Sequence, residues 1–119
     1  MDILVTNNPL VEERYRDAYR VEYLHAPLID VLIRARDHIH KGCLLLTHPL
    51  SGGVKPNETP YKSVLISVSG GKTDERSLHI IEECIKIAYE LPPGQISDKF
   101  LADMRIIDLA LIEPALEKG

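Results

Sequence analysis

Short apolar runs alternate along this chain with segments of helical spacing, and this alternation constrains the fold more than any other feature. The apolar runs cover residues 3–6, 43–46 and 63–68, and residues 20–24 alternate in polarity as a half-buried strand does; all four segments have lengths typical of β-strands. A strand–helix–strand–helix–strand order favours right-handed crossovers and parallel pairing. We therefore predict a three-layer α/β fold with Rossmann-like topology, in which a four-stranded, mostly parallel sheet carries helices on both faces.

Capping residues mark the expected starts and ends of the first two helices. Asn7 or Asn8 is a favourable N-cap, and Pro9 suits the first helical position. The second helix opens near Pro27 and ends before Gly42, the residue type that most often follows a helix. Its apolar stripe has helical spacing and is expected to face the sheet, through Leu28, Val31, Leu32, Ala35 and Ile39.

Two further helices are expected in the second half of the chain, one capped by Thr73 or Asp74 and one by Ser97. The last helix has more apolar residues than one buried face needs. One predicted face consists of Phe100, Met104, Ile107 and Leu111, and a second strip consists of Ile106, Leu109 and Ala110. This surface predicts either burial under the sheet or a homodimer through the last helix, with a slight preference for the homodimer.

Length and composition limit the classes of function. The chain has 119 residues, 45% of them hydrophobic, so we expect one domain over residues 1–119 with a substantial core. The net charge of −4 argues against a nucleic-acid partner, and no apolar run is long enough to span a membrane. We expect a cytoplasmic protein in which Cys43 and Cys84 are buried thiols, with no metal site and no cofactor.

The connection over residues 47–61 is much longer than a hairpin needs and is rich in Gly, Pro and polar residues. Loops of this kind usually carry function. In open α/β sheets, ligands bind beyond the carboxyl ends of the strands, and residues 6–9 also follow a strand there. We therefore predict that residues 6–9 and 47–61 together form a ligand site.

The chemistry of these two loops favours an anion. A helix N-terminus follows Asn8, Gly52 and Gly53 can expose backbone N–H groups, and Lys55 supplies a positive charge. His48 is a candidate acid or base, although spacing fixes no partner for it. The predicted ligand-binding residues are Thr6, Asn7, Asn8, Thr47, His48, Ser51, Gly52, Gly53, Lys55, Asn57 and Tyr61.

Four segments of the sequence, TNNPLV, DVLIRARDHIHKG, LLTHPLSGGVKPNETPYKSVLIS and RIIDLALI, resemble the GrdX family. The resemblance extends over residues 6–112. Members of this family are small proteins associated with the gene clusters for glycine, sarcosine and betaine reductase in amino-acid-fermenting anaerobes. The resemblance implies an accessory role in that system rather than a reaction of its own.

Three functions agree with these features. The first is a non-catalytic accessory protein that binds a small anionic metabolite or a glycine reductase component through the two loops. The second is a small enzyme acting on a phosphorylated or carboxylated metabolite such as acetyl phosphate, with Lys55 stabilising charge and His48 moving a proton. The third is a structural assembly protein that docks through the last helix.

Overall fold

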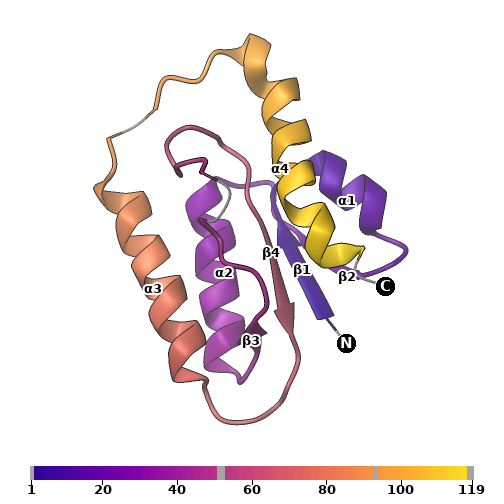
Figure 1. Ribbon diagram of the computed structural model, residues 1–119, viewed down its shortest axis with the longest axis vertical. Helices are drawn as coiled ribbons and strands as arrows, with labels where there is room; N and C mark the ends of the chain where they lie inside the picture. Colours follow the sequence, from indigo (N-terminus) through magenta and orange to yellow (C-terminus); the bar gives the residue numbers. More distant parts are fainter. Residues whose placement is uncertain (1, 51–52, 93, 118–119) are drawn as a thin grey trace.

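The computed structural model describes residues 2–50, 53–92 and 94–117 and has the expected alternation of strands and helices (Figure 1). The elements in chain order are β1 (Asp2–Thr6), α1 (Pro9–Tyr15), β2 (Arg20–Tyr23), α2 (Leu28–His40), β3 (Leu44–Leu45), β4 (Ser63–Ser67), α3 (Glu75–Glu90), the 3₁₀ helix η1 (Asp98–Phe100) and α4 (Leu101–Leu116). Asn8 and Asp74 are the N-caps of α1 and α3. The prediction of an α/β fold is confirmed.

The sheet has the strand order β2-β1-β4-β3 and is mixed. The β1–β2 pair is parallel, whereas β4 is antiparallel to both β1 and β3. The prediction of a mostly parallel sheet is therefore wrong, and a Rossmann-like topology is not confirmed. The reason is that no helix separates β3 from β4, so the chain reverses at one edge of the sheet instead of crossing over.

The position of each strand in the sheet agrees with how many of its residues are apolar and buried. Val64, Leu65 and Ile66 of β4 are all buried, and β4 lies in the interior of the sheet beside β1. By contrast, β3 is a two-residue edge strand, and the next residue, Leu46, is 48% exposed. The apolar run at residues 43–46 is thus too short to extend the sheet further.

Helices cover both faces of the sheet, as predicted (Figure 1). On one face α2 and α3 lie side by side and bury Ile3, Val5, Val64 and Ile66. The whole predicted apolar stripe of α2 is buried there. On the other face α1 and α4 cover Leu4 and Leu65. The segment between α3 and α4 carries the chain from the first face to the second.

The buried face of α4 differs from the predicted one. Phe100, Ile107 and Leu111 were expected to share a face, but each is at least 40% exposed. The buried residues of α4 are Asp108, Leu109, Ile112 and Leu116. Apolar residues surround α4 almost completely, so helical periodicity alone did not select a face. The polar contacts of Asp108, described below, identify the side that faces the sheet.

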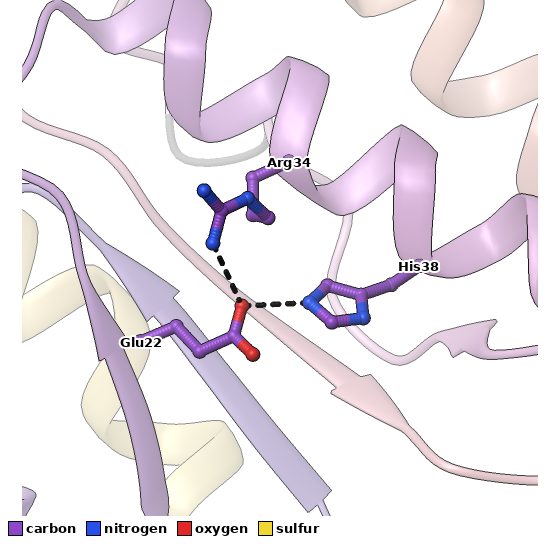
Figure 2. A network of polar contacts seen from close by, with 3 residues as sticks. All are labelled: Glu22, Arg34 and His38. Carbon is purple, nitrogen blue, oxygen red and sulfur yellow. Dashed lines mark hydrogen bonds and ion pairs between the residues drawn. The ribbon is translucent and has the colours of Figure 1, made fainter.

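A polar network joins the edge strand β2 to α2 (Figure 2). Glu22 Oε1 lies 2.6 Å from His38 Nε2 and 3.5 Å from an Arg34 guanidinium nitrogen. Arg34 is largely exposed, so this ion pair adds little stability. The shorter contact orients β2 against the helix.

None of the helices in the described part of the chain is long and apolar enough to cross a membrane.

Candidate functional site

The polar connections of the fold lie together beyond one end of the strands, rather than along an edge strand. β1 and β3 end at this edge, and because β4 is antiparallel, it begins there, with Ser63 paired to Thr6. The connections at residues 6–9, 24–27 and 46–62 therefore meet at the same place. This edge contains the two predicted loops, and we call it the polar edge.

A buried hydrogen-bond cluster connects β1, β4 and α4 at the polar edge. Asp108 Oδ2 accepts hydrogen bonds from Asn8 Nδ2 at 3.0 Å and from Ser63 Oγ at 2.8 Å. Thr6 Oγ1 lies 2.7 Å from Ser63 Oγ and accepts the Asn8 backbone N–H. Burial raises the pKa of Asp108, while these hydrogen bonds and the charge of Lys62 oppose the shift. Through Asp108, the cluster connects α4 by hydrogen bonds to Asn8 and to the start of β4.

Asn7 joins three connections of the polar edge. Its Nδ2 donates to the carbonyl oxygens of Ala26, at 3.0 Å, and Pro60, at 2.7 Å. Its Oδ1 accepts the backbone N–H of Lys62 at 2.8 Å. Asn8 also caps α1 through Leu10 N–H. The side chains of Thr6, Asn7 and Asn8, predicted to bind a ligand, thus have internal hydrogen bonds that position the loops.

A cleft of about 340 Å³ opens at the polar edge beside β1, β2 and α4, within the size range of small-molecule sites. Arg105 of α4 donates from Nε to the Tyr61 hydroxyl at 2.8 Å, and its guanidinium lies 5.4 Å from the centre of the Tyr61 ring. We call this space the Arg105 cleft. Its lining contains no carboxylate among the described residues and consists of Asn7, Pro9, Tyr23, His25, Ala26, Pro27, Pro60, Tyr61 and Arg105.

A second, much smaller recess is lined by Thr47, His48, Pro49, Lys62, Ser63, Asp108, Leu111 and Ile112. Its volume of about 20 Å³ is enough for one water molecule. Lys62 is only 4% exposed. Burial lowers the pKa of Lys62, against the opposing effects of Asp108 and Cys84. We call this space the Lys62 recess.

The remaining predicted site residues do not form one site. Thr47 Oγ1 accepts Leu65 N–H, and His48 Nδ1 accepts Leu50 N–H at the surface. Lys55 and Gly53 are exposed. Asn57 lines a separate groove of about 580 Å³ and donates from Nδ2 to the carbonyl oxygen of Pro92.

Ser51 and Gly52 lie outside the described residues. Of the predicted ligand set, Asn7 and Tyr61 line the Arg105 cleft, Thr47 and His48 line the Lys62 recess, and Asn57 lines the separate groove. The role of each of these residues in ligand binding stays a prediction, as does acid–base chemistry by His48.

Arg105, Lys62 and Asp108 were not predicted from the sequence. Arg105 is 44 residues from Tyr61 along the chain, so no local motif connects them. The available signal was a charged residue inside an otherwise apolar segment: Arg105 and Asp108 in the last helix, and Lys62 directly before the strand β4. Lysine and aspartate are rarely buried without a partner, so such positions are candidates for a polar cluster.

In the part of the chain that the structure describes, the cysteines and the metal-ligating residue types form no further site. Cys43 and Cys84 are buried free thiols, as predicted. Burial raises the pKa of Cys84 to about 11. Within residues 2–50, 53–92 and 94–117, no three His, Cys, Asp or Glu side chains lie close enough to share a metal ion.

The mixed sheet, the two helical layers and the polar edge describe a small α/β protein with concave polar surfaces at one end. The GrdX-like protein family matches residues 3–117, nearly the whole sequence, and the chain belongs to this family. The comparisons with curated proteins and with solved structures gave no match.

Proposed function

We propose that the protein is a non-catalytic accessory protein of the glycine, sarcosine and betaine reductase system, and that it binds a small anionic metabolite in the Arg105 cleft. Family membership supports the metabolic context, since the GrdX family is associated with those gene clusters. The observation that carries the ligand class is the charge of the cleft. Arg105 contributes a permanent positive charge, and the described lining contains no carboxylate to neutralise it.

The contacts of Arg105 support recognition of a carboxylate or a phosphate. The Tyr61 hydroxyl holds Nε, and the Tyr61 ring lies against the guanidinium, so the side chain is oriented before a ligand arrives. An oriented guanidinium loses little conformational entropy when it binds, and its terminal nitrogens can pair with two oxygens at once. His25 at the cleft adds a second group that can donate a hydrogen bond to an anion.

Replacing Arg105 with methionine is expected to weaken anion binding by about tenfold or more, because a charge-assisted pair contributes roughly 1.5–3 kcal/mol. Binding is measured as the ligand-induced rise in melting temperature with phosphate, acetate, acetyl phosphate, glycine, sarcosine and betaine. Arg105→Lys is expected to retain part of the affinity, because lysine keeps the positive charge but lacks the planar guanidinium that can pair with two oxygens at once.

The control is Lys86→Met, which removes an exposed cation from α3, far from the cleft lining. It is expected to leave every shift unchanged. If Arg105→Met and Lys86→Met both bind as the original protein does, the ligand is not held by Arg105. If no anion shifts the melting temperature of the original protein, a reductase component becomes the candidate occupant of the polar edge.

A second role rests on the exposed face of α4. Ile106, Ile107 and Leu111 of α4, together with Phe100 at the end of η1, are 40–56% exposed, which leaves an apolar surface along this segment. We propose that this surface joins two copies of the chain.

Ile106→Glu is expected to shift the protein toward monomer in size-exclusion chromatography with light scattering, because a carboxylate would be desolvated in the contact. Ile87→Glu on α3, where Ile87 is 39% exposed, is the matched control. A monomeric original protein would exclude this role.

A further inference from the structure

The Arg105 cleft adjoins a larger space, the groove of about 580 Å³ that Asn57 lines and that we call the Asn57 groove. Pro27 and Pro60 line both spaces, so the cleft and the groove meet at these two prolines. Pro27 is exposed, so a bound molecule can pass over it from one space to the other. The cleft and the groove are therefore two parts of one elongated surface.

The Asn57 groove has a different chemistry from the Arg105 cleft. It lies where the start of α2 meets the end of α3 and the connection that follows α3 (Figure 1). Its described lining contains no charged side chain, and most of its residues are apolar, among them Leu28, Ile29, Ala88, Leu91 and Ile96. A surface of this kind favours contact with a hydrocarbon group and disfavours the burial of a charge.

Close contacts hold one wall of the Asn57 groove in place. Asn57 Nδ2 donates to the carbonyl oxygen of Pro92 at 3.0 Å, which joins the long loop to the connection after α3. A Cβ at Gly94 would collide with the carbonyl oxygen of Asn57, so these two segments approach as closely as only glycine allows. The groove is thus formed by contacts within the protein, as small-molecule sites usually are.

We propose that the ligand of the Arg105 cleft is an amphipathic monocarboxylate, a short- or medium-chain fatty acid, whose apolar tail lies in the Asn57 groove. This inference rests on the function proposed above, since Arg105 must bind the carboxylate. The distribution of charge supports this orientation, because the permanent cation lies in the cleft and the described lining of the groove has none. An anion of the size of acetate would leave the groove in water, whereas an apolar tail removes both surfaces from water.

A homologous series of acids tests the proposal on the original protein. Acetate, butyrate, hexanoate and octanoate are titrated into isotope-labelled protein, and the backbone NMR signals report both the affinity and the residues affected. We expect the affinity to rise about threefold for each added methylene, the factor expected for burying most of a CH₂ group. The signals of Ala88 and Ile96 should shift with octanoate but not with acetate. Octanamide, which has the tail without the charge, is expected to bind about tenfold more weakly than octanoate.

Three variants assign the two parts of the ligand to the two spaces. Ile96→Gln is expected to weaken octanoate binding by about threefold or more and to leave acetate binding unchanged. Ile87→Gln is the matched control, since Ile87 lies on α3 outside the lining of the groove and is 39% exposed. Arg105→Met is expected to weaken acetate and octanoate binding by a similar factor, about tenfold. If Ile96→Gln does not fold, the residues that shift in the original protein still decide where the tail lies.

The outcomes separate this inference from the function proposed above. If Arg105 binds acetate but octanoate binds no more tightly, the anion site stands and the amphipathic ligand is wrong. If Arg105→Met binds octanoate as the original protein does, the carboxylate is not held by Arg105, and the inference is overturned. Binding of a peptide with a C-terminal leucine, but of none of the acids, would make a protein C-terminus the occupant and would overturn it as well. If no anion of any kind binds, the proposed anion site and this inference are both wrong.

Discussion

Replacing Asp108 with alanine is expected to lower the free energy of unfolding by about 3 kcal/mol, because two buried donors lose their acceptor. Asn8 Nδ2 and Ser63 Oγ both donate to Asp108 Oδ2, and Asp108 itself is only 4% exposed. Each unsatisfied buried donor costs roughly 1–3 kcal/mol. Urea denaturation followed by circular dichroism measures the change. A loss below about 1 kcal/mol would mean that the cluster does not hold α4 to the sheet.

Asp108→Asn is the matched control and also tests the pH dependence. The amide oxygen can accept the same two hydrogen bonds, so this variant is expected to remain close to the original protein. Because burial raises the folded-state pKa of Asp108 above its ordinary value of 3.8, the stability that Asp108 contributes is complete below that value. It is lost as the pH rises through the folded-state pKa.

The original protein should therefore lose stability relative to Asp108→Asn as the pH rises above about 4. Unfolding curves of both proteins across this range measure the difference. A difference that changes in the opposite direction would mean that the carboxylate, and not the neutral acid, is favoured in the folded state.

Replacing Gly42 with alanine is expected to destabilise the protein by a similar amount, about 3 kcal/mol. Gly42 ends α2 with a φ of +100°, a conformation that is unfavourable by roughly 1–2 kcal/mol for residues with a Cβ. A Cβ there would also lie 2.3 Å from the carbonyl oxygen of Gly71, so the turn before α3 would have to move. Overpacking of this kind adds roughly 1–3 kcal/mol.

Gly71→Ala is the control for this second change. A Cβ at Gly71 would meet no atom within 4 Å, and Gly71 does not have a positive φ. We expect its effect on unfolding to remain within about 0.5 kcal/mol, as for ordinary surface substitutions. If the two variants unfold at the same urea concentration, the close approach of α2 to the turn does not contribute to stability.

Local signals in the sequence predicted most of the secondary structure. The helix starts at Asn8 and Asp74 are visible because capping side chains bond to backbone groups two or three residues away. The buried stripe of α2 follows from helical spacing, since only one face of that helix is apolar. In α4 the same reasoning was wrong, because apolar residues lie on nearly every side.

The candidate sites were much less predictable. The two loops do meet at one edge, but the loop residues that were selected for their chemistry mostly bond to each other or to the backbone. The charged groups of the Arg105 cleft and the Lys62 recess come instead from α4 and from the start of β4. Contacts such as Arg105 with Tyr61 join residues that have no relation in sequence spacing.

The amino-acid sequence by itself determined the order of strands and helices, the caps and the apolar stripe of α2, because these depend on interactions between near neighbours. Only the tertiary structure decided the direction of β4, the face of α4 that is buried, and the burial of Lys62 and Asp108. Each of these depends on contacts between segments that are distant in the chain. The free energy of such contacts comes from packing and hydrogen bonding across the whole domain, which local patterns do not encode.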